Sequence, residues 1–244
     1  MARDALGEEV SAPRVLVPGA PLEAGTRVVL PEAEARHLRV SRVRPGSEVV
    51  LLDGVAARAA AVLDATGREA VVRELLPPRG EPRRDVTVLL AVGDLPRVEW
   101  AVEKGTECGA RAIVLVAASR SQRAHVAAAA SRIARLRRIA AESAKQCDRT
   151  RVPEIRGPLP SAEALAGVAG GLLVARPGAP PLPRAAAEEG PLAVAIGPEG
   201  GFDAAEERLL DAAGAVPFGL GPRILRLETA VVAALARLVD DGPA

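Results

Sequence analysis

The sequence predicts an α/β protein in which a carboxyl-terminal parallel sheet follows a small β-rich unit. Up to residue 76, short apolar runs separated by Pro and Gly recur, a pattern typical of many short strands. After the Pro-rich stretch 77–82, buried apolar strands alternate with amphipathic helices, which is typical of a parallel sheet. We therefore place the boundary at this stretch and expect domains at 1–78 and 79–244.

In the first domain, we expect five strands and one short helix that begins at a proline. The many short strands in so few residues predict a small β-barrel. The expected strands are Arg14–Val17, Thr26–Leu30, Ser47–Leu52, Ala57–Leu63 and Ala70–Leu76, and the helix is Pro31–Leu38.

In the second domain, apolar periodicity sets the expected elements. Strands are expected at Asp85–Val92, Arg111–Ala117, Gly171–Ala175, Leu192–Ile196 and Val216–Leu220. Helices are expected at Pro96–Gly109, Val126–Gln146, Ser161–Val168, from Asp203 and from about Thr229.

The chemistry is expected at two glycine-bearing loops near the carboxyl terminus. One strand ends in the sequence GPEGG at 197–201, and the next runs into GLGPRILRLETA at 219–230. Loops that follow neighbouring parallel strands can form the two walls of a ligand slot. The glycine spacing matches neither the dinucleotide fingerprint nor the phosphate-binding P-loop. The residues alone therefore predict a small-molecule site without naming the ligand.

Positive charge is concentrated in one segment. Between Ser119 and Arg151 nine Arg or Lys residues face only two acidic ones, a local net charge of +7 in a chain whose formal net charge is +1. Arg132, Arg135 and Arg138 fall on one face of the expected helix, away from its apolar stripe. A basic face on a nearly neutral protein indicates a polyanionic partner such as RNA.

Composition excludes several other classes. No apolar run approaches the roughly 18 residues of a membrane span. Only two His residues are present, so a histidine-rich metal site is not expected. Cys108 and Cys147 stand far apart, which favours a reduced, cytoplasmic setting.

The two loops carry a family resemblance. GPEGGF at 197–202 and LGPRILRLETA at 220–230 resemble the signature of the knotted, SPOUT-type RNA methyltransferases. Within them, the chain is similar to the ribosomal RNA small subunit methyltransferase E family, which methylates N3 of a uridine in the decoding region of 16S ribosomal RNA. The segments 36–46, 103–109 and 142–153 share in the resemblance. The chain departs from the family at Leu227, where Thr is usual, and at Cys108, where Leu is common.

The resemblance implies a trefoil-knotted sheet, a PUA-like barrel that binds RNA, and a homodimer acting on the small ribosomal subunit. It also implies S-adenosylmethionine as methyl donor, with S-adenosylhomocysteine as product. The expected cofactor-binding residues are Ile196, Gly197, Pro198, Glu199, Gly200, Gly201, Leu220, Gly221, Ile224, Leu225 and Leu227. The expected RNA-binding residues are Arg36, Arg39, Arg120, Arg123, Arg132, Arg135, Arg138, Gln146 and Arg149.

Methylation of uracil N3 requires loss of its proton, so a base or a stabilising cation would help. Arg149 and Arg226 are the candidate cations, and Glu199 is a candidate base that has the alternative role of capping its loop. The sequence also allows three alternative functions. The same fold can act on another base or a ribose 2′-hydroxyl, and the chain can be a non-catalytic RNA-binding module. A Rossmann-type dehydrogenase is disfavoured by the missing glycine fingerprint.

Overall fold

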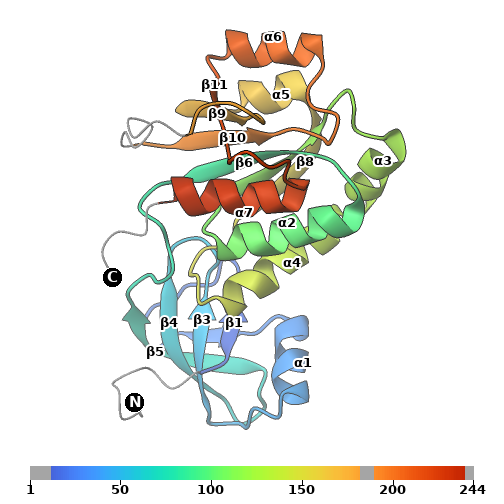
Figure 1. Ribbon diagram of the computed structural model, residues 1–244. Helices are drawn as coiled ribbons and strands as arrows, with labels where there is room; N and C mark the ends of the chain where they lie inside the picture. Colours follow the sequence, from blue (N-terminus) through green and yellow to red (C-terminus); the bar gives the residue numbers. More distant parts are fainter. Residues whose placement is uncertain (1–11, 182–189, 240–244) are drawn as a thin grey trace. The chain divides into compact units, whose positions relative to one another are not determined.

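The computed structural model describes residues 12–181 and 190–239, which form two compact units (Figure 1). The first unit runs to Glu81 and also includes Ala144–Val152, and the second contains Pro82–Ser143 and the chain from Pro153 onward. The boundary therefore falls close to the Pro-rich stretch, but a segment from the middle of the chain belongs to the first unit.

The first unit is a five-stranded sheet with one helix. Its strands are β1 (Arg14–Leu16), β2 (Arg27–Val29), β3 (Glu48–Leu52), β4 (Arg58–Leu63) and β5 (Glu69–Leu76), with α1 at Glu32–Val40. The sheet order is β1-β3-β4-β5-β2, with β1 parallel to β3 and the other pairs antiparallel. Alternate residues such as Val49, Leu51, Ala59 and Ala61 point into one apolar core, because side chains along a strand alternate between its two faces.

The second unit is built on a six-stranded, fully parallel sheet. Its strands are β6 (Val86–Ala91), β7 (Ala112–Ala117), β8 (Glu154–Pro160), β9 (Gly171–Ala175), β10 (Leu192–Ile196) and β11 (Val216–Phe218). They lie in the order β11-β9-β10-β6-β7-β8, so β10 and β6 are adjacent central strands. Both are buried along nearly their whole length, as expected of parallel strands covered on two faces.

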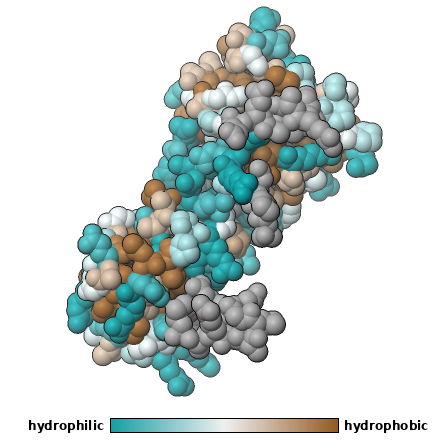
Figure 2. Space-filling model, turned by 90° about the vertical axis from the view of Figure 1, so that its left-hand side faces the viewer, coloured by the Kyte–Doolittle hydropathy of each residue, from teal (hydrophilic) through white to brown (hydrophobic). Residues whose placement is uncertain are grey.

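Helices cover both faces of this sheet (Figure 1). The helix α2 (Leu95–Glu107) packs against α7 (Leu227–Leu238) on one face, and α5 (Ser161–Ala166) packs against α6 (Ala204–Ala212) on the other. The remaining helices are α3 (Arg123–Ser131) and α4 (Ile133–Gln146). Hydrophilic residues cover much of the face seen in Figure 2, with apolar patches between them.

The structure corrects the expected elements at two places. The single helix expected over Val126–Gln146 is two helices, because Arg132 leaves the helical conformation with a φ of −115° and ends α3. The strand β8 was not expected at all, since its prolines hide it. It occupies the edge of the sheet, where a missing backbone N–H does little harm. The expected last helix runs to Asp240, and the sequence also predicts a Pro-rich loop over 176–183; Asp240 and residues 182–183 lie outside the described residues.

Candidate cofactor and RNA site

A cavity of about 400 Å³ lies at the carboxyl edge of the parallel sheet. Its walls come from the last residues of β9 and β10, from the segments that follow β9, β10 and β11, and from the first turns of α6 and α7. The lining residues group by origin as Ala175, Arg176 and Pro177, then Ile196, Gly197, Pro198, Glu199, Gly201, Phe202 and Glu207, and finally Leu220, Gly221, Arg223, Ile224, Leu225, Leu227 and Ala230.

Ten of the eleven expected cofactor-binding residues line this cavity; Gly200 does not. A Cβ built on Gly200 would face Arg120, whose Cδ atom would lie 3.3 Å away. Leu227, which replaces the usual Thr, is 3% exposed at the first position of α7 and adds an apolar surface to the cavity.

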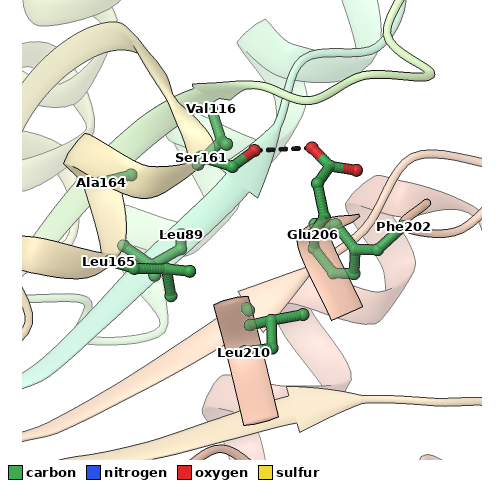
Figure 3. Close-up of a pocket in the computed structure, with 9 residues that line it drawn as sticks. Leu89, Val116, Ser161, Ala164, Leu165, Phe202, Glu206 and Leu210 are labelled. Atoms are coloured by element: carbon green, nitrogen blue, oxygen red, sulfur yellow. Dashed lines mark hydrogen bonds between the residues drawn. The ribbon is translucent and has the colours of Figure 1, made fainter. Parts of the chain in front are cut away.

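A buried carboxylate, that of Glu206, fixes the loop after β10. Glu206 is 6% exposed, and its Oε1 accepts hydrogen bonds from the Ser119 backbone N–H at 2.9 Å and the Ser161 hydroxyl at 2.6 Å. Its Oε2 accepts from the Asp203 backbone N–H at 3.0 Å, which completes a capping box at the start of α6. Figure 3 shows Glu206 and Ser161 facing each other beside apolar side chains. The cavity there measures only about 10 Å³, too small for a ligand.

We expect Glu206→Ala to destabilise this junction strongly. The change leaves two backbone N–H groups and a hydroxyl without their acceptor, and each buried donor left unsatisfied costs about 1–3 kcal/mol. Urea denaturation should show a lower free energy of unfolding than for the wild type. The control is Glu163→Ala on the exposed side of α5, which should change little. If both variants lower the free energy of unfolding equally, Glu206 does not stabilise the junction of these segments.

Two arginines also bind the loop after β10. Arg120, in the loop after β7, donates from Nη1 to the Gly200 carbonyl oxygen. Arg97, in the first turn of α2, donates from Nη1 to Glu199 Oε1 at 2.8 Å. Sequence reasoning assigned Arg120 to RNA alone and missed Arg97, although its position just after the buried strand Asp85–Val92 was a usable signal.

Arg176 and Glu207 form an ion pair in the cavity wall that sequence reasoning also missed. Asp211 lies 3.8 Å from the same guanidinium nitrogen. Arg176 directly follows β9, so its position at the carboxyl edge could have been inferred from the expected strand. The pair joins the β9 segment to α6 and closes that side of the cavity.

The expected RNA-binding residues divide between the two units. Arg120, Arg123, Arg132, Arg135 and Arg138 belong to the second unit, and all five are exposed. Arg36, Arg39, Gln146 and Arg149 belong to the first unit, where Arg149 alone is buried. Arg135 makes two hydrogen bonds to Glu99 of α2, at 2.6 and 2.9 Å, and these bonds lower the pKa of the Glu99 carboxyl. Arg135 is thus partly neutralised, whereas Arg132 and Arg138 show no ion pair among the described residues.

The three candidate catalytic residues lie in different surroundings. Glu199 lines the cavity, with a side chain 57% exposed. Arg226 is exposed at the start of α7, next to the lining residue Leu227. Arg149 does not line the cavity. Its side chain is 2% exposed, and Nη2 donates to Glu81 Oε2 within the first unit at 3.0 Å.

In the described parts of the chain, no helix has both the length and the apolarity needed to cross a bilayer. Nor do residues 12–181 and 190–239 contain a group of three or more His, Cys, Asp or Glu side chains able to hold a metal ion.

Comparison with known proteins identifies close relatives. Residues 80–239 match the model of a family described as an RNA methyltransferase domain. The chain is 34% identical over 225 residues to the ribosomal RNA small subunit methyltransferase E of Mycobacterium bovis, with 87% of this chain and 86% of the relative covered. The Bacillus subtilis protein of the same name is 28% identical over 236 residues, covering 88% and 90%.

A solved structure agrees with these matches. The crystal structure of a ribosomal RNA small subunit methyltransferase E from Neisseria gonorrhoeae bound to S-adenosyl methionine superposes with a TM-score of 0.85. The two chains are 31% identical, and the comparison covers 93% of this chain and 97% of the other.

Proposed function

Since the chain belongs to the ribosomal RNA small subunit methyltransferase E family and is an RNA methyltransferase, we propose that it methylates N3 of a uridine in the decoding region of 16S ribosomal RNA. The methyl donor in this proposal is S-adenosylmethionine, and the product is S-adenosylhomocysteine. The partner is the small ribosomal subunit, so the reaction takes place in the cytoplasm.

The cavity formed by the two signature loops carries the proposal. Its volume of about 400 Å³ falls within the usual range of small-molecule sites. Leu220, Leu225 and Leu227 offer apolar surface for a flat adenine ring, and the glycines at 197, 201 and 221 bring backbone N–H and C=O groups close to the ligand. The residues present therefore fit a nucleoside such as S-adenosylmethionine.

When bound, S-adenosylmethionine supplies an electrophilic methyl carbon, whose bond to sulfur breaks as N3 forms its new bond. The protein has to hold the methyl donor and the uracil base in line. The cavity walls hold the methyl donor, and Glu206, Arg120 and the Arg176–Glu207 pair fix these walls in place. A cysteine nucleophile is not needed, because N3 attacks the methyl carbon directly.

The finer features of the family complete the proposal. We assign the first unit as a PUA-like barrel that presents Arg36 and Arg39 to RNA. In the second unit, we assign a trefoil knot to the chain that forms the parallel sheet. The functional form in this proposal is a homodimer. Support for the assignment comes from the five-stranded sheet of the first unit and from the carboxyl-edge position of the cavity in the second. Arg120, Arg123, Arg132, Arg135 and Arg138 are the proposed phosphate contacts of the second unit.

Replacing Arg132 and Arg138 with Gln should weaken RNA binding and make it less dependent on salt. Removing one arginine–phosphate interaction should reduce the slope of log K against log salt by about 0.7–0.9. The measurement is a filter-binding titration of small-subunit RNA at several salt concentrations. The matched control is Arg208→Gln on the exposed surface of α6. An unchanged slope in the double variant would remove these two arginines from the RNA face.

The proposed function is tested by methyl transfer from labelled S-adenosylmethionine to small ribosomal subunits that lack native modification. Nucleoside analysis should show label in 3-methyluridine. Label in another base or in a 2′-O-methylribose would keep the donor and overturn the target atom. Donor binding without transfer would overturn the substrate, and absence of donor binding would leave an RNA-binding module.

A further inference from the structure

We propose that Arg97, oriented by Glu199, is the cation that contacts the target uracil and stabilises its anion through O2 or O4. The inference rests on the proposed function, because it deepens the account of the same site. It assigns a catalytic residue that lies outside both signature loops and replaces Arg149 as the main candidate for this role.

The topology sets where the base and the donor meet. Along the carboxyl edge, the donor cavity lies over β11, β9 and β10, whereas the exposed Arg120 and Arg123 follow β7. The strand between these two regions is β6, and Arg97 lies six residues beyond its last residue, in the first turn of α2. A nucleotide that is bound on the arginine side and reaches the cavity must therefore pass the end of β6.

The geometry of the Arg97–Glu199 pair suits this position. Glu199 is itself part of the cavity wall and lies at the end of β10, the strand paired with β6. Its carboxylate engages one terminal nitrogen of Arg97, and the remaining donors of this guanidinium have no acceptor among the described residues. The Arg97 side chain is 34% exposed, so these donors are open to a ligand. One carboxylate therefore fixes the guanidinium without occupying all of its hydrogen-bonding capacity.

Arg176 and Arg149 are both placed less well than Arg97 for this task. Arg176 lies beyond β10 on the side away from β7, and the carboxylates of Glu207 and Asp211 both surround it. Arg149 is buried against Glu81 and belongs to the first unit. Arg97 alone among these three combines exposure with a position between the donor cavity and the basic segment.

The chemistry favours a cation at this point. Uracil N3 holds its proton as a weak acid, and the negative charge left by that proton spreads onto O2 and O4. In the proposed step, the N3 proton passes to solvent water, and the guanidinium hydrogen bonds stabilise the uracil anion. The N3 electron pair then forms the bond to the methyl carbon, and the electron pair of the broken carbon–sulfur bond stays on sulfur. A preorganised donor aimed at developing charge contributes about 10²–10³ in kcat.

Removal of Arg97 should therefore change the pH dependence of the reaction. Because a cation favours the anion, Arg97→Met should raise the pKa of bound uracil N3 and move the pH–rate profile to higher pH. At pH 7 and saturating S-adenosylmethionine we expect kcat to fall by about 10²–10³. The deficit should shrink as the pH rises, since hydroxide then removes the N3 proton without help. Arg97→Lys keeps the charge and should recover part of the rate.

A second variant tests the orienting role of Glu199. Glu199→Gln should lower kcat by loosening Arg97, and the double variant Arg97→Met/Glu199→Gln should be no slower than Arg97→Met alone, because both changes remove one interaction. Arg208→Met on α6 is the matched control and should keep the wild-type profile. Trp100, the only tryptophan of the chain and 42% exposed, lies one helical turn after Arg97. Its fluorescence can show that donor and RNA still bind each variant.

A deficit that is equal at all pH values, or a kcat within twofold of wild type, would overturn the inference. So would an effect confined to the KM for S-adenosylmethionine. If Arg97→Met does not fold, Arg97→Gln carries the same expectation. Failure of the proposed function is a separate result, because it would appear as absence of 3-methyluridine with the wild-type enzyme.

Discussion

Arg149→Met is expected to lower the free energy of unfolding by about 3–5 kcal/mol, the usual result of breaking a buried ion pair by removing one partner. The Arg149 side chain is 2% exposed and the Glu81 side chain 15%. Glu81 also accepts a hydrogen bond from the Arg151 backbone N–H at 2.8 Å. The pair therefore helps to fasten the segment Ala144–Val152 into the first unit, and loss of the arginine leaves a largely buried carboxylate.

The measurement is urea denaturation, followed by circular dichroism. Adding Glu81→Gln to Arg149→Met should restore part of the stability, because the remaining partner is then uncharged but still accepts the Arg151 N–H. Arg138→Met is the control, since its side chain is exposed on α4. If Arg149→Met instead abolishes methyl transfer while the unfolding free energy stays at the wild-type value, the catalytic role predicted from the sequence is correct and the structural one is wrong.

Gly219→Ala is expected to lower the affinity for S-adenosylmethionine by about 5–150-fold, which corresponds to the 1–3 kcal/mol typical of overpacking. A Cβ on Gly219 would collide with the Ala179 carbonyl oxygen. The two chain segments also form a backbone bridge, with the Gly219 N–H donating to the Pro180 oxygen at 2.7 Å. The Ala179 oxygen belongs to the backbone and is not the end of a flexible side chain. The two segments must therefore separate to make room for the added Cβ. Their movement displaces the cavity walls on both sides.

Isothermal titration calorimetry with S-adenosylmethionine would measure this loss. Gly167→Ala provides the same chemical change without the collision, since its Cβ would meet only ordinary contacts at 3.7 and 3.9 Å. We expect the control variant to bind the donor as the wild type does. Wild-type affinity in Gly219→Ala would show that the close approach of the two segments does not shape the donor site.

Local signals predicted much of the second unit. The strands Gly171–Ala175 and Leu192–Ile196 have the expected bounds, because continuous apolar runs between glycine and proline are strong signals for buried parallel strands. Asp203 and Glu206 form the expected helix start, and their capping box needs only residues three apart. The break at Arg132 escaped prediction, because no Pro or Gly marks it. Likewise β8 escaped because its prolines disfavour a strand everywhere except at a sheet edge.

The sequence by itself determined the family and the two signature loops, since these depend on residue types at close spacing. Only the tertiary structure decided which surroundings each arginine has. Arg149 and Arg97 cannot be told apart by type, yet one is buried against Glu81 and the other is exposed beside Glu199. Glu81 and Glu199 each lie far in the sequence from the arginine that they bind, and the burial of a side chain follows from the packing of whole elements. The surroundings of each guanidinium are thus set by which carboxylate the fold brings to it and by how much of the side chain stays exposed to water.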